Sequence, residues 1–135
     1  SIPVVKANKP GQPICETRIS DHGNWRHLHW RALQSAYGNS PFFEYYEDDF
    51  RRFYQPDWEF LTDYNRDLMT LVCELLDITP QINNTENFQA VPSMDFQGVA
   101  PRPYYQVFSA RHGFIPDLSI VDLLFNMGPE SVLYL

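Results

Sequence analysis

The sequence has little of several features that common classes of protein require. Its 135 residues include only two cysteines, Cys15 and Cys73, and no basic-then-apolar leader. Two cysteines without secretory context are typical of free thiols in a reducing compartment, so we expect a cytoplasmic protein. No apolar run approaches the about 20 residues that cross a bilayer, so we expect no membrane partner.

Basic charge and clustered glycine are also scarce. The chain has 10 Lys and Arg against 17 Asp and Glu, a net charge of −7. A surface that follows phosphates needs basic side chains gathered on one face, and these are dispersed, so we expect no nucleic-acid partner. The six glycines are scattered, and none forms the glycine-rich turn before a helix that cradles a phosphate.

Aromatic residues are abundant. The chain has 10 Phe, 8 Tyr and 3 Trp within an apolar fraction of 44%. Its length is typical of one domain with a sizeable core, so we expect residues 1–135 to form a single domain. Rings in that core predict wide, stiff packing in which buried Tyr and Trp need polar partners.

Helical spacing of apolar residues dominates the pattern. It predicts three consecutive amphipathic helices, over about 24–37, 41–54 and 57–76, and a C-terminal helix through Phe125. Short β-type pieces predict strands near 2–5, 14–19 and 104–108. The predicted fold class is α+β, predominantly helical, with the three helices packed together. Residues 79–103 predict a long loop, which in a compact domain usually has a function or is mobile.

Two polar residues interrupt apolar helix faces. His29 shares a stripe with Trp25 and Leu33, and Asn65 lies between Leu61 and Leu68. His29 fits either a core histidine that donates to a carbonyl or a general base at the rim of a pocket. A buried amide without partners costs about 1–3 kcal/mol, so Asn65 needs either structural partners or a ligand.

A further polar cluster lies near the C-terminus, at Asp117, Ser119, Asp122 and Asn126. A helix start of the capping-box type explains Ser119 and Asp122, whereas Asn126 has no such explanation.

Metal ligands are the last polar pattern to consider. Asp21, His22, His27 and His29 supply suitable ligand types, but neighbours two apart on a helix point in different directions. We therefore expect no metal and no other cofactor.

Several stretches of the sequence are distinctive enough to compare with known protein families. They read RISDHGNWRHLHW at 18–30, SPFFEYY at 40–46, LTDYN at 61–65 and FIPDLSIVDLLFNMGP at 114–129. These stretches resemble the WbqC-like protein family over nearly the whole chain. Members of that family usually begin earlier, with a Gln-Pro-x-Tyr segment and an Asn-Arg motif, so we expect this chain to lack the family's N-terminal segment.

The resemblance also implies a biological setting. Bacterial relatives are encoded among genes for O-antigen and other surface polysaccharides, often beside nucleotide-sugar enzymes. The matching positions add Tyr37 to the candidate residues. We carry over His29 as a catalytic residue and, as substrate-binding residues, Tyr37, Asn65, Asp117, Ser119 and Asn126.

Two functional hypotheses follow. The first is a transferase acting on a sugar or nucleotide sugar, with His29 as the base or orienting donor. The alternative is a non-catalytic module that binds glycan precursors or a partner protein, which a flat exposed aromatic patch over 42–54 would favour. A third possibility is a scaffold whose chemistry lies elsewhere. A homo-oligomer is compatible with each. Convergence of His29, Asn65 and residues 117–126 on one cleft would favour the first.

Overall fold

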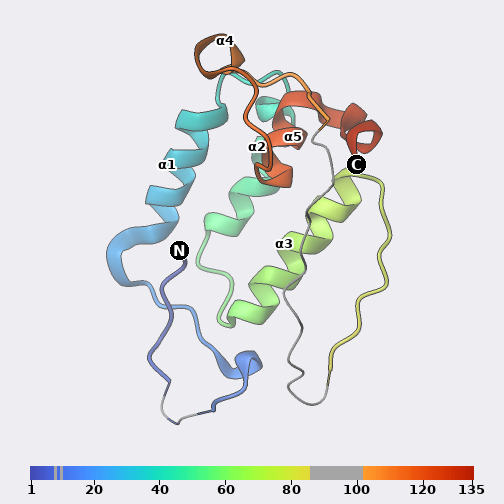
Figure 1. Cartoon of the computed structure of the whole chain (residues 1–135). Helices are drawn as coiled ribbons and strands as arrows, with labels where there is room; N and C mark the ends of the chain where they lie inside the picture. Colours follow the sequence, from blue (N-terminus) through green and yellow to red (C-terminus); the bar gives the residue numbers. More distant parts are fainter. Residues whose placement is uncertain (8, 10, 86–101) are drawn as a thin grey trace.

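The computed structural model describes residues 1–7, 9, 11–85 and 102–135, and within these ranges the chain is predominantly helical (Figure 1). Its α-helices are α1 (Trp25–Tyr37), α2 (Phe43–Arg51), α3 (Leu61–Leu75), α4 (Ser109–His112) and α5 (Ile120–Met127). Short 3-10 segments cover Ile14–Glu16, His22–Asn24, Arg52–Tyr54 and Gly128–Tyr134. The part of the predicted loop at 86–101 lies outside the described residues.

The predicted helices are confirmed, with shifts of a few residues at their starts. The predicted C-terminal helix is α5, and Ser119 is its N-cap, with a side chain that accepts from the Val121 N–H. Helix α2 begins at Phe43, later than predicted. Ser40 does not cap it, because its hydroxyl donates to the Tyr37 carbonyl at 2.5 Å and closes the turn after α1 instead.

The predicted short strands near 2–5, 14–19 and 104–108 are wrong for the part of the chain that the structure describes. The extended pieces pair only through isolated antiparallel bridges, Val4 with Ile19 and Arg18 with Phe60. Pro3 and Pro13 have no N–H to donate, and Ile14–Glu16 coils into a 3-10 turn. In 104–108, the Val107 N–H donates to a side chain, not to a neighbouring strand.

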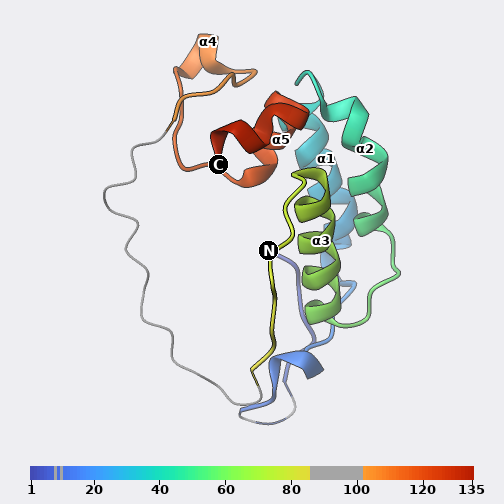
Figure 2. The same ribbon diagram turned by 90° about the vertical axis from the view of Figure 1, so that its right-hand side faces the viewer.

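Helices α1, α2 and α3 run alongside one another, with α5 at one end of the group and α4 beyond it (Figures 1 and 2). The core between them consists mainly of aromatic rings. Phe125 of α5 is fully buried, and its ring lies 5.1 Å from those of Phe43 and Phe50 and 5.2 Å from that of Tyr37. Pairs at these spacings stabilise a core beyond their area alone, so Phe125 connects α5 to both α1 and α2.

Backbone contacts hold α5 against the start of α2. The Phe42 N–H donates to the Phe125 carbonyl at 3.0 Å. Helix α5 ends at Gly128, whose φ of +57° favours glycine, and a Cβ there would overlap the Phe42 ring. The close approach of these two segments therefore depends on a glycine. In the described residues, no helix has both the length and the hydropathy needed to cross a bilayer.

Replacing Phe125 tests this description of the core. We expect Phe125→Ala to lower the free energy of unfolding by about 3–5 kcal/mol, because it removes a fully buried ring and leaves a cavity. The measurement is urea unfolding followed by circular dichroism. The control is Leu28→Ala, at a side chain that is 59% exposed, which we expect to change stability by less than about 0.5 kcal/mol. Equal effects for the two variants would contradict the packing described.

Candidate functional site

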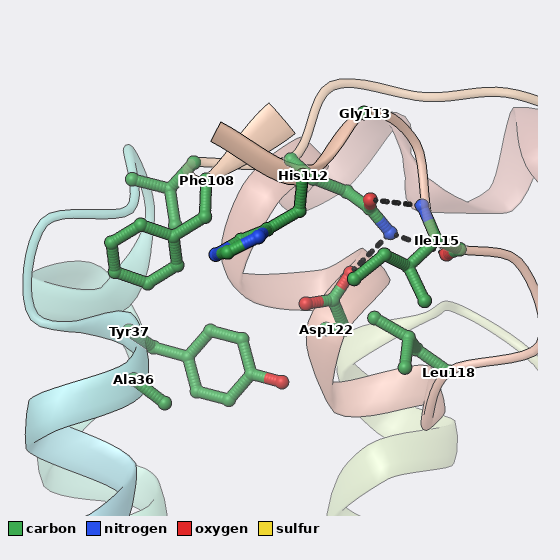
Figure 3. Close-up of a pocket in the computed structure, with 10 residues that line it drawn as sticks. Ala36, Tyr37, Phe108, His112, Gly113, Ile115, Leu118 and Asp122 are labelled. Carbon is green, nitrogen blue, oxygen red and sulfur yellow. Dashed lines mark hydrogen bonds between the residues drawn. The ribbon is translucent and has the colours of Figure 1, made fainter. Parts of the chain in front are cut away.

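A pocket of about 190 Å³ lies where the C-terminal end of α1 meets α4, α5 and the segments beside them (Figure 3). Most of its wall is apolar, and a few polar side chains converge on it, a combination typical of small-molecule sites. Its lining residues are Ala36, Tyr37, Gln106, Val107, Phe108, His112, Gly113, Ile115, Leu118 and Asp122.

Asp122 is the charged side chain in the wall of this pocket, and it is only 5% exposed. Its Oδ2 accepts hydrogen bonds from the Tyr104 hydroxyl at 2.8 Å and from the Gln106 side-chain amide at 3.2 Å. Both donors are neutral. A buried carboxylate held only by neutral donors gains further stabilisation from any cation or strong donor that enters.

Gln106 fixes the part of the pocket wall next to Asp122. Its amide nitrogen donates to the Ile115 carbonyl, and its amide oxygen accepts from the Ile115 N–H, each at 2.9 Å. This side chain is 5% exposed. It therefore joins the two arms of the segment that carries α4 and holds that segment against Asp122, which gives the pocket a defined shape.

Tyr37, at the end of α1, presents its hydroxyl to the Asp122 carboxylate (Figure 3). Burial raises the pKa of Tyr37 to about 12, with smaller contributions from the charge of Asp122 and from a hydrogen bond to it. Its phenol is therefore neutral at physiological pH and can donate to a ligand oxygen or accept from a ligand N–H.

His112, the last residue of α4, has an imidazole that faces the space between Tyr37 and Asp122 (Figure 3). Within the described ranges it forms no hydrogen bond or ion pair with either residue. The two ring nitrogens of the imidazole can donate or accept hydrogen bonds, so they are available to a bound ligand.

The structure brings only some of the predicted site residues to this pocket. Tyr37 lines it. Asn126 lies one turn below Asp122 and is 2% exposed, with Oδ1 accepting from the Val107 N–H at 2.9 Å and Nδ2 donating to the Asp122 carbonyl at 2.8 Å. It supports the pocket wall. Asp117 and Ser119 are exposed beside the pocket without lining it, and Ser119 caps α5.

His29 and Asn65 do not converge with residues 117–126. His29 is half-buried on α1 with its ring 5.2 Å from that of Trp25, and burial, with a smaller effect of the nearby N-terminal charge, lowers its pKa. It lies eight residues before Tyr37, about 12 Å along the helix axis, and does not line the pocket. Asn65 is exposed on α3, so the predicted burial of its amide is wrong.

Three polar side chains of the pocket are not among the predicted site residues: Gln106, His112 and Asp122. The local sequence explains Asp122 as part of the helix start, yet its carboxylate points to Tyr104 and Gln106 and not back to the N-cap. The available signal was a carboxylate within the apolar helix Ile120–Met127, directly before three buried apolar residues. His112 gave no comparable signal, because it is exposed and lies in a short irregular segment.

In the part of the chain that the structure describes, neither a group of metal ligands nor the aromatic stripe over 42–54 forms an alternative site. Across the described residues, no three His, Cys, Asp or Glu side chains are grouped to hold a metal ion. The stripe over 42–54, expected to be flat and exposed if it bound a partner, is largely buried at Phe43, Tyr46, Phe50 and Phe53.

A comparison of the two asparagines tests their different placement. We expect Asn126→Ala to lower the free energy of unfolding by about 1–3 kcal/mol, because it leaves the Val107 N–H without its acceptor. Asn65→Ala is the control and should change stability by less than about 0.5 kcal/mol, since its side chain is exposed. Chemical unfolding of both variants provides the measurement, and a larger loss for Asn65→Ala would refute the placement.

The raised pKa of Tyr37 predicts a loss of stability at high pH. An unfolded chain loses the phenol proton near pH 10, whereas the folded protein keeps it until about pH 12. The unfolded state therefore binds fewer protons across this window, and stability falls as pH rises through it. We expect Tyr37→Phe to lose less stability than the unmodified protein between these pH values in urea unfolding. An identical decline in both proteins would show that Tyr37 does not contribute.

Comparisons with known proteins agree with the resemblance seen in the sequence. An uncharacterized protein of Mycobacterium tuberculosis (strain ATCC 25618 / H37Rv), Rv1507c, is 27% identical over 172 residues, an alignment that covers all of this chain and 74% of the relative. No solved structure matches the chain. The model of the WbqC-like protein family matches residues 1–95 and 92–134. The chain therefore belongs to the WbqC-like protein family.

Proposed function

We propose that this protein acts in the biosynthesis of a bacterial surface polysaccharide and binds the sugar unit of a precursor in the pocket between Tyr37 and Asp122. The observation that carries the proposal is the buried Asp122 carboxylate in a small, otherwise apolar pocket. Membership of the WbqC-like family, whose resemblance implies a setting among polysaccharide genes, supports it.

The size of the pocket favours a ligand of about one ring. Its volume of about 190 Å³ is below the range of about 300–1,000 Å³ typical of sites for drug-sized molecules. A single sugar ring is compact and has an apolar C–H face as well as hydroxyl groups. The apolar wall, which includes Phe108 and Leu118, suits that face.

The polar groups suit the other side of such a ring. A sugar hydroxyl donates to a carboxylate in a short, charge-assisted hydrogen bond, and Asp122 offers that acceptor. Tyr37 and His112 add groups that donate or accept, on two further sides of the pocket. Because these groups come from different elements, they can fix the orientation of a ring as well as its position.

The negative charge of the protein determines which end of a nucleotide sugar can enter the pocket. The chain carries a net charge of −7, and the carboxylate in the pocket wall repels phosphate. We therefore place the sugar inside and the diphosphate and nucleoside outside. Recognition then depends on the sugar and only weakly on the nucleotide.

We further propose that the protein transfers a group onto the bound sugar. Such a transfer requires a base within hydrogen-bond reach of the reacting hydroxyl. His112 lines the pocket and His29 does not, so within this proposal His112 takes the role that the sequence suggested for His29. A module that binds the sugar without transferring a group would use the same pocket, and a search for turnover separates the two.

Filling the pocket tests the binding site. We expect Ala36→Phe to reduce affinity for monosaccharides and nucleotide sugars at least about tenfold in isothermal titration calorimetry, because the new ring occupies the space of the ligand. Ala36 is exposed on α1, so the fold should tolerate the change.

The matched control is Ala32→Phe, one turn earlier on α1, at a position that is also exposed but does not line the pocket. It should bind as the unmodified protein does, and so should His29→Ala. Equal affinities of the two phenylalanine variants, or nucleotides that bind as tightly without their sugar, would rule out the proposal.

A further inference from the structure

The Asp122 carboxylate has no cationic partner in the part of the chain that the structure describes. The ion pairs there join other residues: Arg18 with Glu59, Arg26 with Asp21, and Arg66 with Asp63 and Asp67. The side chain is nevertheless 5% exposed. Removing a charged group from water is costly, and hydrogen bonds from neutral donors offset only part of that cost.

The carboxylate also turns one oxygen toward the pocket. Its hydrogen bonds from Tyr104 and Gln106 both go to Oδ2. The other oxygen, Oδ1, is turned toward the space that Tyr37 and His112 face (Figure 3). A ligand group at this point meets a carboxylate oxygen, a phenol oxygen and an imidazole, while most of the remaining wall is apolar.

We propose that the sugar held in this pocket carries a free amino group, and that its ammonium binds the Asp122 carboxylate. This inference rests on the proposed sugar binding and specifies the class of sugar. An ammonium has three N–H donors and no acceptor, which matches a site that offers several acceptors around one point. It also supplies the positive charge that Asp122 lacks.

Other substituents fit this position less well. A hydroxyl can donate to Asp122 but brings no charge. An N-acetylated amine has lost its charge and is bulkier, in a pocket of only about 190 Å³. A carboxylate or phosphate on the sugar would be repelled. The expected order of affinity is therefore amino sugar, then neutral sugar, with N-acetylated and anionic sugars weaker still.

The test compares glucosamine, glucose and N-acetylglucosamine on the unmodified protein, by isothermal titration calorimetry at about pH 7. At that pH an amino group of this kind is largely charged, as an α-amino group is. We expect glucosamine to bind at least about tenfold more tightly than glucose, since a hydrogen bond between charged groups exceeds a neutral one by about that factor. This comparison needs no variant, so it does not depend on a mutant that folds.

Two variants then locate the preference. Asp122→Asn keeps an oxygen to accept from Tyr104 and Gln106 but removes the charge, and it should bring the affinities for glucosamine and glucose to within about twofold of each other. Asp117→Asn removes a carboxylate from an exposed position five residues away and should leave the preference intact. A preference that survives Asp122→Asn, or that falls equally in both variants, overturns the inference.

The outcomes separate this inference from the proposed function. If glucose and glucosamine bind equally well and Ala36→Phe removes both, the sugar site stands and the amino-sugar inference fails. If none of the three sugars binds, both fail. Preferential binding of glucosamine that Asp122→Asn abolishes supports both.

Discussion

The site depends on one set of buried hydrogen bonds, in which α5 supplies Asp122 and Asn126 and the preceding segment supplies Gln106 and the Val107 N–H. The segment that carries α4 forms local backbone hydrogen bonds, such as those from the Ser109 N–H to Gln106 and from the Gly113 N–H to Ser109, which shape its turn but do not attach it to α5. It is held by side chains instead: Asn126 accepts from its backbone, and Gln106 joins it to Ile115 and to Asp122. Buried polar groups are costly when unpaired. Loss of one hydrogen bond in this set would therefore leave its partner unpaired and destabilise the whole wall of the pocket.

The aromatic core determines where that wall lies. Phe125 follows Asp122 by three residues on α5, so burial of its ring against Phe43, Phe50 and Tyr37 positions the carboxylate above it. Tyr37 takes part in both layers, since its ring packs on Phe125 and its hydroxyl faces Asp122. Packing and recognition therefore share a residue, and a change in the core at Phe125 would be expected to alter the pocket as well.

Local sequence predicted the helices well because each follows from spacing within a few turns. The start of α5 at Ser119 is of this kind, since an N-cap depends on its immediate neighbours. The strands were predicted wrongly because a ladder needs a partner, and local β-type sequence says nothing about partners: Val4 and Ile19 meet in a single bridge. Asn65 and Asn126 show the same limit for side chains. Both interrupt apolar positions, but only contacts with distant segments decide which amide is buried.

The residues that line the pocket come from two stretches far apart in the sequence, 36–37 and 106–122. The length of the chain between these stretches can therefore differ among family members. Tyr37 lies in the first stretch matched by the family model, and Gln106, His112 and Asp122 lie in the second. The alignment with the mycobacterial relative spans 172 residues, more than this chain contains, so that relative has additional residues within the aligned region. Lengthening a surface connection costs only about 0.6 kcal/mol for each doubling of its length. The contacts between α1 and α5 are made by side chains of the two helices and do not involve the chain that connects them. Such contacts can therefore form the same pocket in chains whose connections differ greatly in length.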